Sequence, residues 1–561
     1  MSEINNYIDC DIALIHPPYI FHREKYTIFP PPWNLHHVGS PSYIGRYPIA
    51  PNWNHMPVGY YTMKNFIEKN SKYIVKIINL SIFKYNIPVS IAEKFQPTFK
   101  KDMSVLVDLA EIIYPGQITS AIQKIKADLF AVHLHWLNFS HGAIQILNLL
   151  KETHPCSDTV VGGLTASYFK DEIMRLYPFI DFLIVGDGCI PLLGLIKQIK
   201  SNRDFSKVPN LLYRQREKIK KGKNIFLNDF IYEQNNNSLV RSIPTSRGCP
   251  LQCITCGGSK YSFRKICNYT EIHIYSIESI MKRLFDLTKK HEKNLHLFLI
   301  HDPLLTLGKR NWEILLDEIK RNRLNISFSI EFYLPHSKED IFNIADKVPG
   351  SLIDISPESI DENVRRFHKN IKYANEDLIM NISVINNIKS LSMGVWFMAG
   401  LAEDTKSSID KTLLFIKEYY LKIKNKKKNI FQYNELLFID PGSLAFDYPS
   451  KYGYKLINKT FLSHMESFAM PIFKYQINYE TRHYSRNQLF NQFLYIHNEM
   501  NKVYYENNVI SKIIYNRITL YNNLLRKYSP RYDEALLEKS HLIRYKKFTD
   551  IGNLLRAELE K

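Results

Sequence analysis

The sequence has few cysteines and few glycines, and it has no long apolar run. Seven cysteines in 561 residues, an odd number, exclude the disulfide framework of a small secreted domain. No stretch approaches the roughly 18 uninterrupted apolar residues of a membrane-spanning helix. The N-terminus, MSEINNYIDCDIALIHPP, lacks a basic segment leading into an apolar core, so we expect no secretory signal. These absences predict a cytoplasmic protein.

Acidic residues are also few relative to basic ones. The chain has 74 Lys and Arg against 55 Asp and Glu, a formal net charge of +19. A nucleic acid or an anionic membrane surface could explain such a charge. The lysines are nevertheless dispersed among Asn, Ile and Tyr, which is typical of an AT-rich coding sequence. We therefore do not expect a nucleic-acid partner. The 45% of apolar residues is enough for about three domains with cores of their own.

The first two hundred residues alternate short β-branched runs with helical spacing of apolar residues. Strands are predicted at 11–16, 73–80, 129–133, 159–162 and 182–185. Alternating strands and helices predict a doubly wound, Rossmann-like parallel sheet, here over residues 1–205. Such sheets bind ligands beyond the carboxyl ends of their strands.

The predicted strand ends carry glycines, prolines and small polar residues. Glycine lets a backbone approach a ligand closely, and a hydroxyl group can bond to it. Ordinary turn geometry uses the same residue types, so each cluster alone has a structural alternative. The candidate ligand contacts of this domain are Pro17, Pro18, His135, Gly142, Gly162, Gly163, Thr165, Gly186, Asp187 and Gly188.

A second α/β series follows a polar stretch at 206–240, which we interpret as a linker with a small hairpin. Strands are predicted at 242–246, 296–301, 326–331, 352–356, 395–400 and 431–438. Helices are predicted at 276–291, 312–322, 339–348, 375–390 and 406–423. Six such units within 241–450 favour a partial (β/α)6 barrel over a second open sheet. Residues 451–561 are expected to form a helical C-terminal domain.

Three cysteines are concentrated in one loop. Cys249, Cys253 and Cys256 follow the first strand of the second series with spacing x3 and x2. Soft thiolates select zinc or iron–sulfur clusters. A closed zinc site needs four ligands, and no nearby Cys or His completes one. Three thiolates on a four-iron cluster would leave one iron open. The four isolated cysteines are expected to be buried or half-buried.

The Cx3Cx2C spacing in this position resembles the signature of the radical S-adenosylmethionine (SAM) enzymes. Other segments, among them LHWLNFSHGAIQI, VVGGLTASYF, ISPESIDENVRR and FMAGLAEDT, resemble a largely uncharacterised subfamily with a cobalamin (B12)-binding domain. They lie within 134–456, and the resemblance extends more loosely over 10–480. It implies three cofactors: a [4Fe-4S] cluster held by the three cysteines, SAM and cobalamin.

The same resemblance implies which residues contact SAM. In the segment Ile300-His301-Asp302, which differs from the Gly-Gly-Glu of relatives, Asp302 stands where they contact the SAM amino group. Residues at the end of the fourth barrel strand stand where relatives bind ribose or methionine, and a helix N-cap at Ser359 is the structural alternative. The strand at 395–400 resembles the one whose backbone meets adenine, with close packing as its alternative. The last two groups comprise Ser356, Glu358, Ser359, Met398 and Gly400.

The cobalamin-binding segment departs from the mutase pattern. No Asp-x-His-x-x-Gly motif surrounds His133, His135 or His141. The resemblance then implies a cobalt without a histidine on its lower face. The Gly186-Asp187-Gly188-Cys189 segment also differs at its last position, where relatives carry Glu or another polar residue.

The resemblance implies methylation of an unactivated carbon. An electron from the cluster cleaves SAM to a 5′-deoxyadenosyl radical, which abstracts hydrogen; methylcobalamin gives the methyl group, and a second SAM remethylates cobalt. No catalytic side chain is assigned. The substrate, a small molecule or peptide, is not identified, and the electron donor would be a flavodoxin or ferredoxin.

Three alternatives stay open at this stage. The first is a rearrangement or oxidation with the same cofactors. The second is a tRNA-modifying radical enzyme, which would carry a second cysteine triplet that the N-terminal half lacks. The third is a cobalamin sensor or carrier, for which an intact cluster triplet would have no use.

Overall fold

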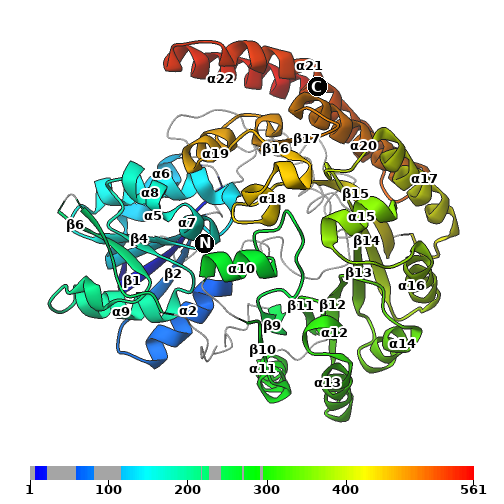
Figure 1. Cartoon of the computed structure of the whole chain (residues 1–561), viewed down its shortest axis with the longest axis horizontal. Coiled ribbons are helices and arrows are strands. Elements are labelled where there is room, and N and C mark those ends of the chain that lie inside the picture. The colour runs from blue at the N-terminus through cyan, green and yellow to red at the C-terminus, as the bar shows by residue number, and fades with distance from the viewer. Residues whose placement is uncertain are drawn as a thin grey trace.

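The computed structural model consists of two α/β units and a helical C-terminal segment (Figure 1). This confirms the predicted fold class. Residues 226–240 of the predicted linker lie outside the described part of the chain. The structure describes residues 7–19, 21, 58–80, 115–216, 218–225, 242–267, 271–290, 295–426 and 428–560.

The first unit is built on a parallel sheet with helices on both faces. Its strand order is β2-β1-β3-β4-β5, so the order reverses between β1 and β3. Successive strand residues point to opposite faces. In β1, Ala13 and Ile15 therefore join one apolar core, and Ile12 and Leu14 join the other. The strands are β1 (Ile8–His16), β2 (Val75–Asn79), β3 (Ile125–His133), β4 (Asp158–Gly162) and β5 (Phe182–Ile184).

Each core of this unit is completed by its own helices. Apolar residues of α5 (Pro115–Gln123) and α6 (Ser140–Thr153) belong to the first core, and those of α2 (Val58–Lys69) and α9 (Cys189–Ile199) belong to the second. Helices on both faces of a parallel sheet define the doubly wound architecture that the sequence predicts.

The small hairpin expected within 206–240 comprises β6 (Leu211–Gln215) and β7 (Lys218–Lys221). Its first strand pairs antiparallel with β5, so the hairpin extends the first sheet to seven strands. The boundaries of the domains themselves stay predictions.

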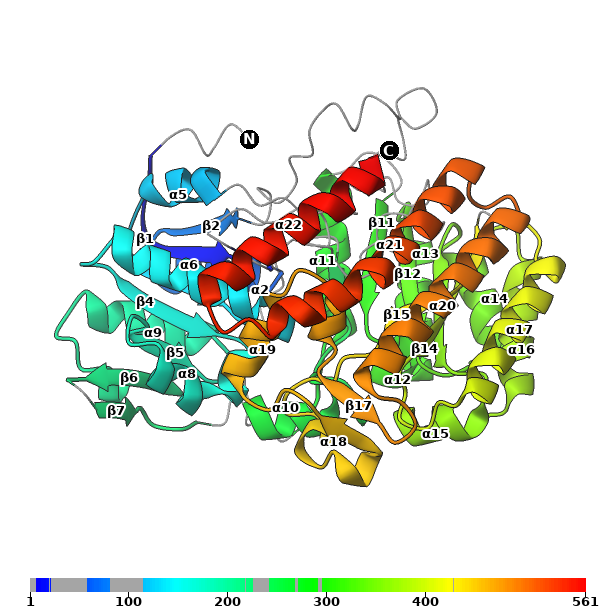
Figure 2. The ribbon, with the colours of Figure 1, turned by 90° about the horizontal axis from the view of Figure 1, so that it is seen from above.

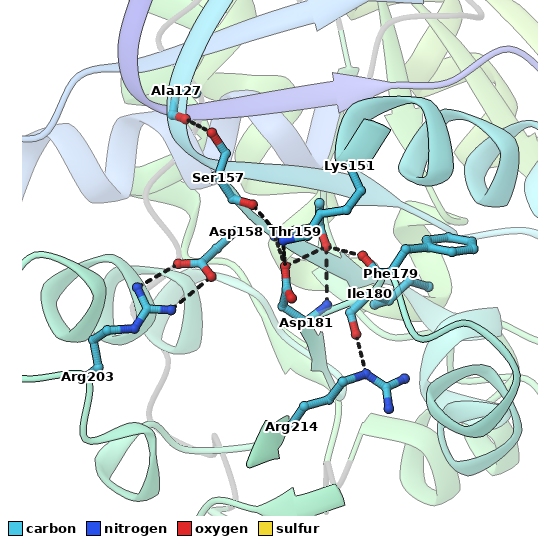
Figure 3. Close-up of polar contacts among 10 residues, drawn as sticks. All are labelled: Ala127, Lys151, Ser157, Asp158, Thr159, Phe179, Ile180, Asp181, Arg203 and Arg214. Atoms are coloured by element: carbon cyan, nitrogen blue, oxygen red, sulfur yellow. Dashed lines mark hydrogen bonds and ion pairs between the residues drawn. The ribbon is translucent and has the colours of Figure 1, made fainter. Parts of the chain in front are cut away.

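A network of hydrogen bonds and ion pairs links the amino ends of β4 and β5 to each other and to neighbouring segments (Figure 3). Arg203 donates to both carboxylate oxygens of Asp158, at 3.0 and 2.9 Å. Asp181 accepts hydrogen bonds from the Thr159 backbone and from Lys151, both at 2.9 Å. These residues lie at the end of the sheet opposite to the loops where ligands bind. We therefore interpret the network as structural.

The second unit is an incomplete barrel of six parallel strands in sequential order, β8-β11-β12-β13-β14-β15. Its two edge strands do not pair with each other, and its helices lie outside the strands (Figure 1). The strands are β8 (Ser242–Pro244), β11 (Leu295–Ile300), β12 (Ile326–Phe332), β13 (Leu352–Glu358), β14 (Ser392–Ala399) and β15 (Asn429–Leu436). The helices are α11 (Ile277–Lys290), α13 (Lys309–Arg321), α14 (Lys338–Lys347), α16 (Asn375–Asn387) and α17 (Lys406–Lys422).

The inner face of this barrel is polar. In β12, Phe328 and Ile330 are fully buried in the apolar core. Ser329 and Glu331 alternate with them and therefore face the opposite side. Glu331 lies next to Asp354 of β13 in the strand register. Two carboxylates thus stand side by side on the inner wall.

The C-terminal segment is mostly helical, as predicted, but it also contains two strands. β16 (Tyr454–Leu456) and β17 (Tyr479–Thr481) form an antiparallel pair. Three-residue strands are too short to show a period of two, so the sequence did not reveal them. The long helices α20 (Arg486–Glu506), α21 (Lys512–Leu536) and α22 (His541–Glu560) lie along one side of the molecule (Figure 2). Among the described residues, no helix combines the length and apolarity needed to cross a membrane.

Candidate active site

The three cysteines lie on one loop between β9 (Ser246–Arg247) and α10 (Lys260–Cys267). All three are half-buried and none forms a disulfide. The Cys256 amide donates to the Cys253 carbonyl at 3.3 Å, which folds the loop back on itself. The Gly258 amide donates to Cys256 Sγ, also at 3.3 Å. Amide hydrogen bonds to sulfur are among the interactions that tune cluster thiolates.

The protein around these thiols disfavours their ionisation in the absence of a metal. Burial raises the pKa of Cys253 to about 12. Burial also raises the pKa of Cys249 and Cys256. The negative charge of Cys249 adds to the rise in the pKa of Cys253, and the charges of Cys253 and Cys249 add to the rise in the pKa of Cys256. Metal coordination would replace the thiol protons.

The donor set fits an iron–sulfur cluster better than a single ion. In the described part of the chain, no three His, Cys, Asp or Glu side chains converge on one metal-ion position. A cluster is wider than one ion, so its ligands stand further apart. Three soft thiols, with no fourth protein ligand among the described residues, match the ligand set of a four-iron cluster.

Two other elements hold the cysteine loop in place. The Ile254 amide donates to the carbonyl of His368, at 3.1 Å, in α15 (Glu362–Lys369). On the other side, the Gly257 amide donates to the Asp440 carboxylate at 2.9 Å. Burial raises the pKa of Asp440 to about 6. The loop is therefore fixed between the ends of the barrel strands.

Asp302, predicted to contact SAM, is fully buried and makes four hydrogen bonds inside the protein. It caps α12 (Pro303–Thr306), and its Oδ1 accepts from the amides of Leu304 and Leu305. Its Oδ2 accepts from the Tyr333 amide at 3.0 Å and from His336 Nε2 at 2.8 Å. These contacts give Asp302 a structural role, and its contact with SAM stays a prediction.

The predicted SAM residues at the end of β13 lie together. Ser356 Oγ donates to Glu331 Oε1 at 2.8 Å, and Glu358 Oε1 lies 3.1 Å from Lys369 Nζ. Ser359 Oγ accepts from the Asp361 amide at 3.1 Å. Asp361 caps α15, so the alternative that Ser359 is the cap is wrong.

Glu331 is a site candidate that sequence reasoning missed. It is half-buried on the inner wall, and Ser356 donates to one of its oxygens. Burial raises its pKa, although the nearby Lys369 charge opposes that rise. The alternation Ser327-Phe328-Ser329-Ile330-Glu331 is the signal that could have revealed an inward carboxylate at a strand end.

Met398 and Gly400 occupy the end of β14. Met398 is half-buried. Gly400 has φ +86°, and a Cβ there would overlap the hydroxyl of Tyr479. Close packing, the alternative considered from sequence, thus accounts for this glycine. Whether the backbone meets adenine stays a prediction.

The carboxyl edge of the first sheet faces the cysteine loop. Asp187, in the loop after β5, forms an ion pair with Arg247, two residues before Cys249. Trp136, in the loop after β3, is 39% exposed and lies about 3.6 Å from the position of a Cβ built on Gly258. The predicted cobalamin-binding loops and the predicted cluster loop therefore share one junction.

Packing within the protein requires two of the predicted glycine contacts of the first unit, Gly142 and Gly163. A Cβ at Gly142 would overlap the Pro18 carbonyl. Gly163 has φ +116°, and its Cβ would lie 2.6 Å from the Leu134 carbonyl oxygen. These glycines by themselves do not indicate a ligand. The remaining candidates at this edge include Pro17, which is buried, Thr165, which donates to the His135 carbonyl at 3.1 Å, and Gly162, Gly186 and Gly188, which are half-buried.

Two of the three histidines near the cobalamin loops already have protein partners. His133 stacks on His16, with ring centroids 4.6 Å apart, and their ring nitrogens form a short contact. His141 Nδ1 accepts from the Phe21 amide at 3.2 Å. Burial lowers the pKa of His141 to about 3. His135 alone among the three is exposed.

The isolated cysteines differ in environment. Cys10, Cys189 and Cys267 are buried, as expected, but Cys156 is exposed. Cys156 lies in the turn between α6 and β4, where the chain runs over the surface, and the expectation of burial was wrong for it.

Comparison with solved structures shows a shared fold. TsrM of Kitasatospora setae, a radical SAM methyltransferase solved with cobalamin and a [4Fe-4S] cluster, superimposes with a TM-score of 0.56 at 12% identity, covering 98% of this chain and 100% of TsrM. OxsB, a cobalamin-dependent SAM radical enzyme solved with aqua-cobalamin, gives 0.55 at 13% identity, covering 100% and 80%. The chain has the fold of cobalamin-dependent radical SAM enzymes, which confirms the architecture that the resemblance implied.

Sequence comparison gives a more distant relative. An uncharacterised methyltransferase of Pyrococcus horikoshii, PH0819, is 19% identical over 334 residues, which cover 56% of this chain and 70% of that protein. No protein-family model matches the chain.

Proposed function

We propose that this chain is a cobalamin-dependent radical SAM enzyme that methylates an unactivated carbon of its substrate. The observation that carries this proposal is the junction between the two α/β units. Asp187 and Trp136 of the first unit lie against the loop that bears the three cysteines. Two cofactors bound at these loops would face the same substrate.

The proposal assigns residues to each cofactor. Cys249, Cys253 and Cys256 hold a [4Fe-4S] cluster. The strand ends of the barrel hold SAM through Ser356, Glu358, Ser359, Met398 and Gly400, with either Asp302 or Glu331 as the acidic contact. The edge that bears Pro17, Pro18, His135 and Asp187 holds cobalamin. When bound, the cluster supplies the electron that cleaves SAM, and methylcobalamin supplies the methyl group.

The chain's own contribution is to position these groups and exclude water. The cysteine loop is held on both sides by backbone hydrogen bonds to His368 and Asp440. The inner wall offers carboxylate and hydroxyl groups, which can accept hydrogen bonds from ribose hydroxyls and an ammonium group. Groups fixed in this way lower the entropic cost of reaching a reactive geometry.

The ratio of the two SAM products tests the proposal. A methylation of this kind uses two SAM molecules per turnover, one giving S-adenosylhomocysteine and the other 5′-deoxyadenosine with methionine. We expect both products in about equal amounts with the true substrate and a low-potential reductant, after correction for uncoupled cleavage. 5′-Deoxyadenosine without S-adenosylhomocysteine would indicate a rearrangement or oxidation instead.

The remaining elements of the proposal are a cytoplasmic location, an electron donor of the flavodoxin or ferredoxin type and a small-molecule or peptide substrate. A tRNA-modifying enzyme of the methylthiolating kind is disfavoured because only Cys10, Cys156 and Cys189 precede the barrel. A cobalamin sensor would not need the cysteine triplet. Failure of the reduced, cluster-loaded protein to cleave SAM would revive that alternative.

A further inference from the structure

The last residue of α15 is a lysine buried next to the cysteine loop. Lys369 is 3% exposed. Its neighbour His368 accepts a hydrogen bond from the Ile254 amide, and His368 Nε2 lies 3.5 Å from Thr255 Oγ1. Ile254 and Thr255 are the two residues between Cys253 and Cys256. The end of α15 therefore docks directly on the predicted cluster loop.

The ammonium group of Lys369 makes three contacts, one for each of its protons. It lies 3.1 Å from Glu358 Oε1 and 3.3 Å from the Tyr333 carbonyl oxygen, and it donates at short range to the Ser356 carbonyl. Tyr333 directly follows β12, and Ser356 and Glu358 end β13. Lys369 thus joins two strand ends of the barrel to the helix that supports the cysteine loop.

Glu358 needs such a partner. Its φ of +67° lies in the left-handed region, which a non-glycine residue adopts only when its surroundings hold it there. It is buried, and it lies where the strand register shifts between β13 and β14. The contact with Lys369 fixes its carboxylate at the predicted SAM-binding edge.

A buried ion pair is weak evidence for a purely stabilising role, because desolvation offsets much of its attraction. Burial opposes the charge on Lys369, yet Glu358 and the neighbouring anionic groups hold the pKa of Lys369 above its ordinary value. Lys369 directly follows His368, whose carbonyl holds the cysteine loop through the Ile254 amide, so the cation is fixed next to the loop that bears the thiols.

We propose that Lys369 is a positioning residue of the cluster–SAM centre, which fixes the Glu358 carboxylate and places a permanent positive charge beside the cluster thiolates. This inference rests on the proposed function. Reduction adds an electron to the cluster, and a nearby positive charge stabilises the reduced form. Lys369 then raises the reduction potential of the cluster and strengthens SAM binding through Glu358.

Reduction potentials of the cluster test this inference, measured by EPR-monitored titration of the full-length, reconstituted protein. Lys369→Met should shift the potential to a more negative value, and Lys369→Arg should largely restore it. Glu358→Gln should shift the potential in the opposite direction, because it removes a negative charge. Opposite signs for the two variants distinguish an electrostatic effect from a general loosening of the site.

SAM binding to the same variants supplies a second readout, by calorimetry. Lys369→Met should weaken SAM binding by about tenfold, equivalent to about 1.4 kcal/mol. The matched control is Lys474→Met, which removes another buried lysine, 3% exposed and paired with Asp533, from the C-terminal segment. This control should leave the potential and SAM binding unchanged.

Each outcome decides between the inference and its failure. An unchanged potential and unchanged SAM affinity in Lys369→Met would overturn it, as would equal shifts in the Lys474→Met control. If Lys369→Met does not load a cluster, Lys369→Arg decides instead: a loaded cluster with nearly the wild-type potential and SAM affinity supports the inference, and a loss of either overturns it. A wild-type protein that binds no cluster would instead contradict the proposed function.

Discussion

Arg247 and Asp187 form an ion pair that joins the two α/β units beside the predicted cluster loop. Asp187 is almost completely buried, and its Oδ1 also accepts from the Cys189 amide at 2.9 Å. One carboxylate thus accepts from the first residue of α9 and binds the strand that leads into the cysteine loop. The contact couples the position of the first sheet's edge to that of the cysteines.

Replacement of Arg247 should destabilise the contact between the first α/β unit and the cysteine loop. Arg247→Met leaves the buried Asp187 carboxylate without that cation, which should cost about 3 kcal/mol of unfolding free energy. Arg203→Met removes the exposed partner of Asp158 at the other end of the sheet and should cost about 1 kcal/mol or less. Urea titrations of both variants measure the difference. Equal losses would show that the junction has no special importance.

The cysteine triplet should be necessary for iron binding. Replacement of Cys249, Cys253 and Cys256 together by alanine should abolish iron loading, because it removes all three predicted cluster ligands. Wild-type protein reconstituted without oxygen should hold about four irons per chain. Cys10→Ala, in the core of the first sheet, is the control and should load normally. Iron analysis and the visible absorbance band report the result, and a triple variant with a full cluster would refute the assignment.

Glu331 and Asp302 should differ in their effects on SAM. Glu331→Gln should weaken SAM binding by about tenfold or more, because hydrogen bonds to a charged group contribute about 1.5–3 kcal/mol. Asp302→Asn should mainly lower stability, since its carboxylate already accepts four protein hydrogen bonds. Calorimetry on cluster-loaded protein, together with thermal melts, separates these outcomes. A selective loss of SAM affinity in Asp302→Asn would restore the assignment made from sequence.

Cobalt should carry no histidine on its lower face. His133 and His141 have protein partners, and the Asp-x-His-x-x-Gly motif is absent. The EPR spectrum of the cob(II)alamin form should therefore show no nitrogen superhyperfine splitting that is traceable to His133, His135 or His141. His135, the exposed one of the three, is the residue to test. Splitting that disappears in His135→Ala would show that this histidine is a ligand after all.

The free energy of unfolding should fall as pH rises, because the carboxyl group of Asp404, near the end of β14, is buried. Burial raises the pKa of Asp404 to about 7 from its ordinary 3.8. Between these two values the folded state binds the proton more tightly than the unfolded state, so its contribution to stability is lost with rising pH. A shift of about three units corresponds to roughly 4 kcal/mol.

Asp404→Asn cannot titrate and should flatten this part of the profile. Denaturant melts at pH 5 and pH 8 should show a smaller difference for the variant than for the wild type. Asp410→Asn, which removes a surface partner of Lys406, is the control and should retain the wild-type profile. Equal slopes for wild type and Asp404→Asn would show that Asp404 is ionised in the folded protein throughout.

The sequence by itself determined the two α/β series and the cysteine loop. The alternation of β-branched runs with helical spacing marks strands such as β1 and β3, because burial on both faces of a parallel sheet requires apolar runs. The spacing of Cys249, Cys253 and Cys256 is a local property that no distant contact can alter. Local patterns of this kind are readable without a structure.

Only the tertiary structure decided which polar groups already have hydrogen-bond partners within the protein and which ones face the site. Asp302 and Glu331 are both carboxylates at strand ends, yet the first accepts four internal hydrogen bonds and the second faces the inner wall. Nothing in the sequence indicated that Lys369 lies at the predicted cofactor site, since its partners Tyr333 and Glu358 are 36 and 11 positions away in the chain. Contacts between residues distant in the chain depend on how the strands pack. Desolvation and hydrogen bonding, which decide the chemistry of a carboxylate or an amine, therefore arise only in the folded protein.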